Sequence, residues 1–172
     1  MIDIRIAKET DAEVLALLGR VTYIESHAHF VNNKADINHY ANEAYAVSKI
    51  REELKNENTK YYLACYKELP VGFVKLVLDS TLSCIDSEKT IRLEKNYVLE
   101  DFIECKIGKK LLEFSLEKVK AYSYESIWLT VYIKNIRAIK FYHKYDFTEV
   151  GKMDYIVNGK KFENDVLFKK IE

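Results

Sequence analysis

The stretch WLTVYIKNIRAIKFYHKYDFTEVG, residues 128–151, decides which fold the chain is expected to adopt. It begins inside a continuous apolar run at 126–133, which is typical of a central strand buried on both faces of a sheet. The segment 135–145 has helical spacing and opens with Asn135, a good helix-capping residue. The segment 147–157 then returns to a strand pattern. A strand, a helix and a second strand in this order predict a sheet with a helix packed on it.

The remaining chain supplies further elements of both kinds. Alternating or apolar segments predict the other strands, at residues 2–7, 60–67, 68–78, 87–100 and 160–171. Helical spacing predicts helices within residues 8–27 and 32–56, and another from near Gly108 to about residue 122. A tight Leu69-Pro70 turn is expected between the second and third strands. An Asn158-Gly159 hairpin turn is expected between the last two.

The order of these elements is β-α-α-β-β-β-α-β-α-β-β. This order predicts an α+β or mixed α/β fold with one main sheet and helices on both faces. The chain has 172 residues, one proline and five glycines, and no segment has the composition of an interdomain linker. We therefore expect residues 1–172 to form a single domain, since domains commonly have about 100–200 residues.

Charge and cysteine content narrow the classes of function. The 27 Lys and Arg residues balance 27 Asp and Glu residues, which argues against nucleic acid as a partner. The beginning of the chain lacks the apolar region of a secretory signal, and no apolar run is long enough to span a bilayer, so no membrane association is expected. Cys65, Cys84 and Cys105 form neither a disulfide framework nor a metal motif, which favours a reducing cytoplasm.

The segment FIECKIGKKLLEF, residues 102–114, follows a predicted strand and opens a predicted helix. Amides in the first turn of a helix lack internal partners, and the helix dipole places positive charge there, so phosphate binds such ends readily. Gly108 would let a ligand approach the backbone, and Lys106, Lys109 and Lys110 would add positive charge. The alternative is an amphipathic helix with solvated lysines.

The two segments together resemble the GNAT superfamily of N-acetyltransferases. The residues that carry the resemblance are Asn135, Arg137-Ala138, Phe141-Tyr142 and Asp146-Phe147, beside the segment YVLEDFIECKIGKKLLEF at 97–114. Within the superfamily the chain looks most like the PaiA-type spermidine/spermine acetyltransferases. The resemblance implies a mixed, largely antiparallel sheet of about seven strands. It also implies transfer of an acetyl group from acetyl-CoA to a small primary amine, which a polyamine-like acceptor would satisfy, in an enzyme that is often a homodimer.

The chain departs from the family pattern in the loop that holds the diphosphate of coenzyme A. The usual Gln or Arg is Ile103, the first glycine is Lys106, and only Gly108 matches. If the glycine position is left-handed, Lys106 costs about 1 kcal/mol or more there. Glu104 is unfavourable near a diphosphate unless it turns to solvent. The alternative function is therefore a non-catalytic acyl-CoA-binding or regulatory module with a degenerate loop.

The resemblance assigns roles residue by residue. Tyr142 matches the tyrosine that protonates the leaving thiolate, although a core tyrosine is the alternative. Glu94 is a candidate base or amine-steering carboxylate, or else a solvated strand residue. Asn135 caps its helix and could also face the coenzyme. The coenzyme-binding set is Tyr97, Val98, Leu99, Glu104, Cys105, Lys106, Ile107, Gly108, Lys109, Lys110, Asn135 and Tyr142.

The acceptor site is expected near Glu25, His27 and His29, which lie between the first two helices. The two histidines have no third ligand at metal spacing, so no metal is expected. Cys105 stands just before a helix among lysines, where it is either a reactive thiol or a tolerated free one.

Overall fold

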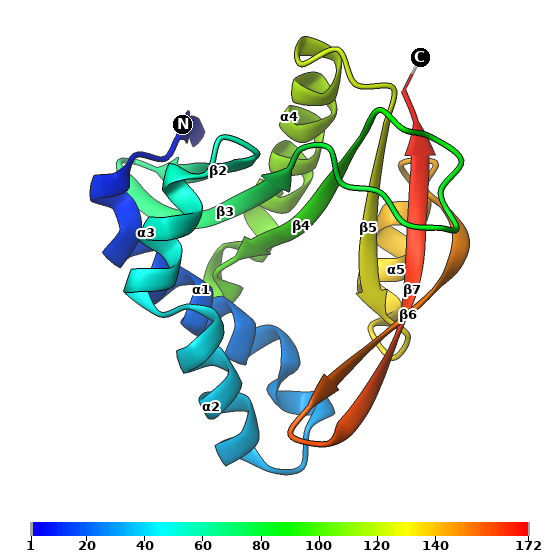
Figure 1. Cartoon of the computed structure of the whole chain (residues 1–172). Helices are drawn as coiled ribbons and strands as arrows, with labels where there is room; N and C mark the ends of the chain where they lie inside the picture. The colour runs from blue at the N-terminus through cyan, green and yellow to red at the C-terminus, as the bar shows by residue number, and fades with distance from the viewer. Residues whose placement is uncertain (1, 172) are drawn as a thin grey trace. The chain divides into compact units, whose positions relative to one another are not determined.

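The computed structural model describes residues 2–171 (Figure 1). The strands are β1 (Ile2–Ile6), β2 (Thr59–Tyr66), β3 (Leu69–Val77), β4 (Thr90–Val98), β5 (Ser126–Tyr132), β6 (Thr148–Val157) and β7 (Lys160–Lys170). The helices are α1 (Ala12–His27), α2 (Lys34–Ala44), α3 (Val47–Lys55), α4 (Ile107–Ala121) and α5 (Ile136–His143). Three short 3-10 turns, η1 (Glu9–Asp11), η2 (Ala28–Phe30) and η3 (Glu100–Cys105), connect them.

The strands form one seven-stranded sheet in the order β1-β2-β3-β4-β5-β7-β6. Strands β4 and β5 are parallel, whereas β1 and β2, β5 and β7, and β6 and β7 are antiparallel. The predicted mixed, largely antiparallel sheet of seven strands with flanking helices is therefore confirmed.

The predicted helical region at 32–56 is two helices, because the chain leaves helical geometry at Ala46 (ψ 136°). The preceding Tyr45 is 1% exposed, and its ring lies against Gly19 of α1. A β-carbon on Gly19 would lie 2.0 Å from that ring. Gly19 has no side chain, so the Tyr45 ring packs directly on the main chain of α1. This contact fixes the position of Tyr45, and the chain then turns to begin α3.

The predicted Leu69-Pro70 turn was wrong. The chain reverses at Lys67 and Glu68, whose φ angles are +48° and +68°, the left-handed geometry that matches the twist of a two-residue hairpin. Pro70 is instead the second residue of β3, near the start of the strand, where a missing N–H is tolerated. The predicted Asn158-Gly159 turn is confirmed, with φ angles of +49° and +71°.

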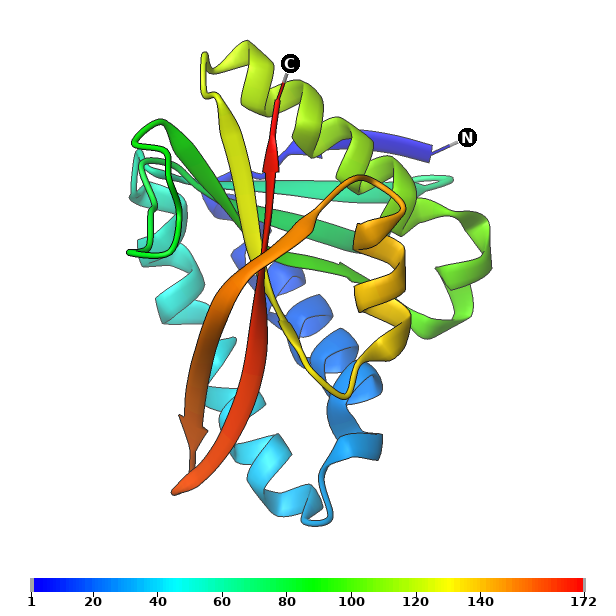
Figure 2. The same cartoon turned by 90° about the vertical axis from the view of Figure 1, so that its right-hand side faces the viewer.

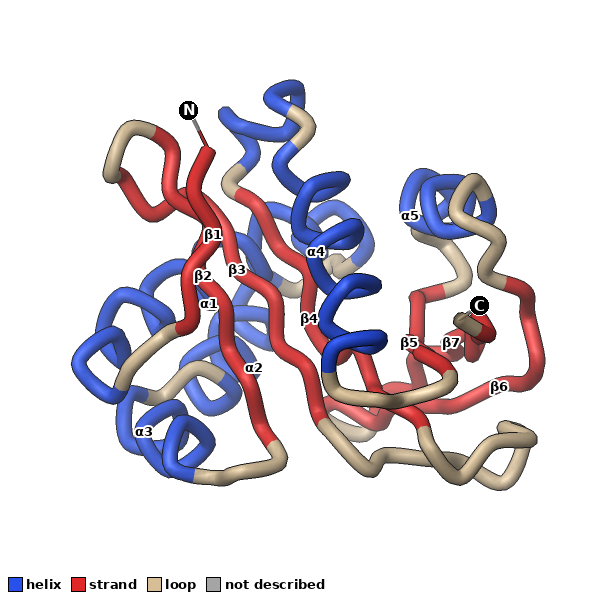
Figure 3. The backbone as a smooth tube through the Cα atoms, turned by 90° about the horizontal axis from the view of Figure 1, so that it is seen from above, coloured by secondary structure: helices blue, strands red, loops and turns tan. Residues whose placement is uncertain are grey.

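Two compact units make up the chain. The first unit runs to Leu76 and also contains Lys95–Ser115. Its core gathers α1, α2, α3 and the adjacent strands around buried side chains that include Leu15, Tyr45 and Phe73. Figure 3 shows β1, β2 and β3 side by side with α3 next to them.

The second unit contains Val77–Glu94 and the chain from Leu116 onward. A small core of Ile85, Trp128, Val166 and Phe168 lies within it. Strands β6 and β7 form a twisted hairpin (Figure 2), with a register irregularity between Glu149 and Gly151. That the two units form one domain stays a prediction.

Candidate functional site

The start of α4 presents a row of helix-terminal amides. Lys106, which ends η3, has φ 58° and ψ 25°, so it occupies the left-handed region expected for the glycine that it replaces. The first bond of the following helix runs from the Lys110 amide to the Lys106 carbonyl, at 3.1 Å. The amides of Ile107, Gly108 and Lys109 precede that bond, so they are donors that the helix does not use. This local geometry suits an anion.

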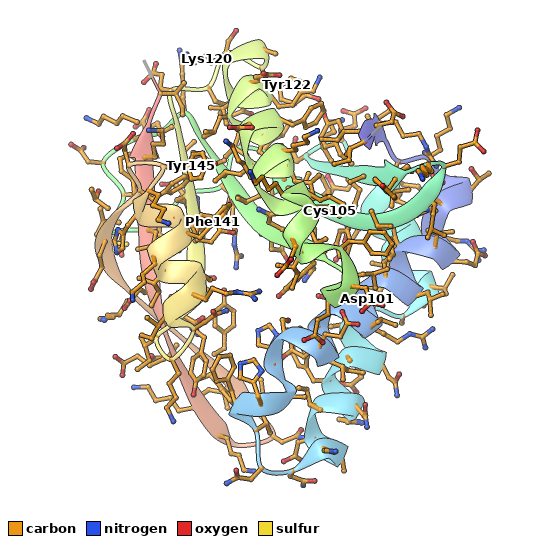
Figure 4. The ribbon with its side chains drawn as sticks, turned by 180° about the vertical axis from the view of Figure 1, so that it is seen from behind. Asp101, Cys105, Lys120, Tyr122, Phe141 and Tyr145 are labelled. Carbon is orange, nitrogen blue, oxygen red and sulfur yellow. The ribbon has the colours of Figure 1, made fainter. Side chains whose placement is uncertain are left out.

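The side chains around these amides leave their approach open. Glu104, Cys105, Lys106, Lys109 and Lys110 are exposed, and Figure 4 shows Cys105 at the end of η3. The Glu104 carboxylate therefore points to solvent. This orientation is needed if the turn is to hold a phosphate, because a carboxylate close to a phosphate would repel it. The Lys109 ammonium lies 3.6 Å from the Glu113 carboxylate one turn along the helix.

The space beside Gly108 is also open. A β-carbon on Gly108 would find its nearest neighbour, the Val98 Cγ2 atom, at 3.9 Å, whereas the preceding Ile107 is fully buried and anchors the turn. The turn is therefore fixed by an apolar side chain and remains accessible on its backbone.

One side of β4 faces this turn. The Asn96 side-chain amide donates to the Gly108 carbonyl at 3.3 Å. Its Oδ1 atom is buried and has no partner among the residues that the structure describes. Buried polar atoms nearly always have a partner, so this acceptor suits a ligand N–H or a bound water.

The main chain of Leu99 already has partners within the protein. Its amide, a candidate for holding the coenzyme, donates to the Val71 carbonyl at 2.9 Å, and its carbonyl accepts from the Phe102 amide at 2.9 Å. The Leu99 amide is therefore used inside the first unit, and a coenzyme-binding role of Leu99 stays a prediction. Tyr97 and Val98 stay candidates.

His27 lies on the other side of β4, against the Tyr97 ring. Its imidazole stacks on Tyr23 with ring centroids 4.2 Å apart, and meets the Tyr97 ring edge-on at 6.2 Å. The Nδ1 atom lies 3.0 Å from the Tyr23 carbonyl oxygen and 2.7 Å from the Ser26 hydroxyl. A carbonyl oxygen only accepts, so Nδ1 carries the proton and Nε2 keeps its lone pair.

The pKa of His27 is lowered to about 4, mainly by removal from water and to a lesser extent by the nearby His29 and Lys95 charges, against the raising effect of the Tyr23 carbonyl. His27 is therefore a neutral, fixed imidazole at pH 7. The Lys95 ammonium lies 4.9 Å from the Tyr45 ring on the same side of the strand.

The other two expected acceptor residues are placed differently. A Glu25 carboxylate oxygen accepts from the Glu100 amide at 3.0 Å, so this side chain caps the start of η3. His29 is exposed and packs on the Phe30 ring. Among residues 2–171, no three potential metal ligands come together.

Residues of the second unit supply the expected proton donor. Asn135 Oδ1 accepts from the Ala138 amide at 3.1 Å, which confirms the predicted cap of α5. Tyr142 is half-buried on α5, with its ring edge-on to Phe141 at 5.1 Å and to Phe147 at 5.6 Å. Figure 4 shows Phe141 on this helix. The acid role of Tyr142 stays a prediction.

The ladder between β4 and β5 is short. It pairs Thr90–Arg92 with Ser126–Trp128, although β4 continues to Val98 and β5 to Tyr132. Beyond its last pair, β5 keeps its pairing with β7. Glu94 follows the last of these pairs by two residues, within the second unit.

A polar cluster at the last pair of this ladder was missed from the sequence. The Arg92 guanidinium lies 4.9 Å from the Trp128 ring, and its Nη2 atom donates to the Tyr155 hydroxyl at 2.5 Å. That hydroxyl lies 3.1 Å from the Thr130 hydroxyl. The alternation T-I-R-L-E at 90–94 could have placed Arg92 on one side of the strand with Glu94, but Tyr155 comes from a distant strand.

Comparison with known proteins shows the family and the fold. Residues 24–147 match the sequence model of the acetyltransferase (GNAT) family. An uncharacterized N-acetyltransferase in the pepI 3' region of Lactobacillus delbrueckii subsp. lactis is 24% identical over 139 residues, which are 81% of this chain and 80% of that protein. An N-alpha-acetyltransferase of Sulfolobus acidocaldarius is 33% identical over 104 residues, which are 58% of this chain and 62% of that protein.

Solved structures of the same fold cover the whole chain. The PaiA N-acetyltransferase of Thermoplasma acidophilum, in complex with coenzyme A, has a TM-score of 0.75 at 22% identity and covers 99% of each chain. The ribosomal-protein-S18-alanine N-acetyltransferase of Escherichia coli has a TM-score of 0.72 at 14% identity, over 100% of this chain and 95% of that one.

Proposed function

Because the chain belongs to the acetyltransferase (GNAT) family, we propose that it transfers the acetyl group of acetyl-CoA to a small primary amine, which attacks the thioester directly in a ternary complex. A polyamine-like acceptor is one class that the resemblance to the PaiA-type enzymes suggests. The bound coenzyme supplies an acetyl group activated as a thioester.

The observation that carries the proposal is the left-handed backbone of Lys106. The missing glycine has not removed the turn, since Lys106 adopts φ 58°. The amides of Ile107, Gly108 and Lys109 therefore remain available to a diphosphate, with the Lys106 and Lys110 charges beside them. The cost of the left-handed lysine is about 1–2 kcal/mol, which is small beside the binding energy of a diphosphate held by several amides.

Two further features of the first unit fit the coenzyme. Asn96 Oδ1 is a buried acceptor with no partner in residues 2–171, and the amide N–H groups of the pantetheine arm are donors of the matching kind. Tyr97 and Val98 follow Asn96 on the same strand. We propose that these residues bind the arm, with the exposed Glu104 and Cys105 bordering its entry.

The chemistry requires a neutral amine and a protonated leaving group. We propose that Tyr142 donates a proton to the departing thiolate, because a phenol with an ordinary pKa near ~10 is protonated at neutral pH. Glu94 is proposed to steer the amine, and His27 to line the acceptor site through its Nε2 lone pair. Asn135 serves the site by starting α5, the helix that carries Tyr142.

Two measurements test the function. Calorimetric titration with acetyl-CoA is expected to show binding, and its absence at millimolar coenzyme removes the proposal. A thiol-release assay over polyamines, amino acids and peptides is expected to show turnover with one class of amine. Binding without turnover on any acceptor favours the alternative, a non-catalytic acyl-CoA-binding or regulatory module. The departures from the family pattern at Ile103 and Lys106 are the reason for considering this alternative.

The cellular compartment and the oligomeric state of the protein are also proposals. Cys65, Cys84 and Cys105 are unpaired, which suits the reducing cytoplasm that the sequence predicts. A homodimer stays a prediction from the resemblance. No helix within residues 2–171 has both the length and the apolar character needed to cross a membrane.

A further inference from the structure

Arg92 is a half-buried cation with no acidic partner among residues 2–171. Within the described part of the chain it makes one hydrogen bond, from Nη2 to the Tyr155 hydroxyl, and its buried Nε atom meets no partner there. A guanidinium carries several N–H donors and no acceptor, so most of its hydrogen-bonding capacity is unused. Placing a charge away from water without a counter-charge is costly, which makes the arrangement unlike a purely structural one.

Acidic side chains of the neighbouring hairpin are committed to other cations. Asp165 pairs with Lys152, and Asp154 pairs with the Lys161 ammonium at 2.7 Å. Because Arg92 has no acidic partner among residues 2–171, an acidic ligand would supply the balancing negative charge.

The groups around Arg92 are suited to a carboxylate. The Tyr155 hydroxyl accepts from Arg92 and donates only to the Met153 sulfur at 3.8 Å, a weak acceptor that a carboxylate oxygen would replace. The Thr130 hydroxyl lies 3.1 Å from the Tyr155 hydroxyl. The three side chains come from β4, β5 and β6, and the Arg92 guanidinium carbon lies 4.9 Å from the centroid of the Trp128 ring. A guanidinium with adjacent hydroxyls favours a planar, acceptor-only ligand, and an arginine binds a carboxylate more specifically than a lysine does.

The position of the cluster connects it to the acceptor amine. Arg92 and Trp128 form the last pair of the β4–β5 ladder, within the second unit. Glu94, proposed to steer the amine, follows Arg92 by two residues, a spacing of roughly 6.6 Å along a strand. The Glu94 carboxylate would thus bind the ammonium group of an acceptor, and the Arg92 guanidinium would bind its carboxylate group. Their spacing along the strand suits a small zwitterion.

We propose that Arg92, with Tyr155 and Thr130, binds the carboxylate of the acceptor, so that the acceptor is an amino acid and not a polyamine. This inference rests on the proposed function, because it assigns the substrate class of the same site. A polyamine would bring further positive charge toward Arg92 and leave the guanidinium unpaired.

The test compares matched acceptors on the full-length protein. Thiol release is measured with the twenty amino acids, with the carboxamide of the best one, with its decarboxylated amine and with spermidine. The amino acid is expected to have the highest kcat/KM. In Arg92→Met its kcat/KM should fall about tenfold to a hundredfold, the range for a hydrogen-bonded charge, while that of the carboxamide changes by less than about threefold. Lys89→Met is the matched control, because it removes an exposed positive charge just before the start of β4. This variant should behave as wild type.

Equal use of the acid and its carboxamide by the wild-type protein overturns the proposal, as does preference for spermidine. An equal loss on both acceptors in Arg92→Met also overturns it, because that result indicates a structural role. If circular dichroism shows that Arg92→Met is unfolded, Tyr155→Phe replaces it, with a smaller loss expected on the amino acid alone.

A second readout separates this proposal from the acetyltransferase function. Trp128 is the only tryptophan of the chain, and it lies against Arg92. Without coenzyme, its fluorescence should change on titration with the amino acid but not with the carboxamide, and Arg92→Met should abolish the change. Absence of any carboxylate-dependent change overturns the inference even where thiol release succeeds. A clear change without coenzyme binding would instead retain the inference and remove the proposed function.

Discussion

A β-carbon on Gly72 would lie 2.7 Å from the main-chain oxygen of Tyr97 and 3.2 Å from the Val98 Cα atom. Strands β3 and β4 therefore approach each other closely at the residues proposed to hold the pantetheine arm. A side chain at position 72 would have to displace main-chain atoms of β4. Main-chain atoms in a sheet move less easily than the end of a flexible side chain.

Gly72→Ala is expected to destabilise the protein by about 1–3 kcal/mol, the usual range for overpacking. Gly108→Ala is the matched control, because its new β-carbon would meet nothing closer than 3.9 Å. Urea denaturation measures both. Gly108→Ala should keep its stability but weaken coenzyme binding, since it lies where backbone amides meet the diphosphate. Equal stability of the two variants would contradict the close approach of the strands.

Lys106→Gly is expected to raise the free energy of unfolding by up to about 1 kcal/mol. The gain comes from relieving the left-handed φ of 58°, and the greater freedom of glycine in the unfolded chain offsets part of it. Because the turn is already formed, the affinity for coenzyme A should stay within about fivefold, the effect of one exposed charge at a helix end. Lys106→Ala removes the charge but keeps the strain, so it isolates the two contributions. A large gain in affinity for Lys106→Gly alone would show that the lysine distorts the turn in solution.

His27 is expected to titrate with a pKa of about 4, well below its ordinary 6.5. Between those two values the unfolded chain binds a proton that the folded chain does not, so the fold loses stability as the pH falls through this window. The melting temperature should therefore drop on acidification from pH 7 to 4.5. The drop should be smaller in His27→Asn, which retains a donor near the position of Nδ1. NMR titration of the imidazole measures the pKa directly, and a midpoint near 6.5 would refute the burial of this ring.

Tyr142→Phe is expected to lower turnover by about tenfold or more with little change in coenzyme affinity, because only the proton donor is lost. The edge-on ring contacts with Phe141 and Phe147 persist in the variant, so the fold should be unaffected. Steady-state thiol release and calorimetry give the two quantities. Tyr145→Phe is the control on a neighbouring tyrosine. Unchanged turnover in Tyr142→Phe removes this residue from the acid role.

Asn135→Ala is expected to cost about 1 kcal/mol of stability through loss of the α5 cap. Asn33→Ala removes the corresponding cap of α2, where the side chain accepts from the Ala35 amide at 3.0 Å, and should cost a similar amount. Coenzyme affinity distinguishes the two roles of Asn135. If only Asn135→Ala weakens coenzyme binding, the side chain also faces the coenzyme, whereas equal affinities leave it as a cap alone.

Local patterns determined much of the architecture. The apolar run at 126–133, the capped helix after Asn135 and the Asn158-Gly159 turn each depend on short-range chemistry, and each is present as expected. The resemblance places a glycine at position 106 and leaves open whether its backbone is left-handed, and the structure gives Lys106 a φ of 58°. Strands, helix caps and tight turns depend on backbone sterics and on the periodicity of apolar residues. Both can be read from residues that are neighbours in the sequence.

Contacts between distant residues decided the rest. The break before α3 depends on the Tyr45 ring meeting Gly19, and the neutral state of His27 depends on Tyr97 closing over it from β4. Arg92 meets Tyr155 across 63 residues of chain, so no local pattern identifies their cluster. Burial and hydrogen bonding are properties of the assembled fold, because they depend on which segments remove a group from water.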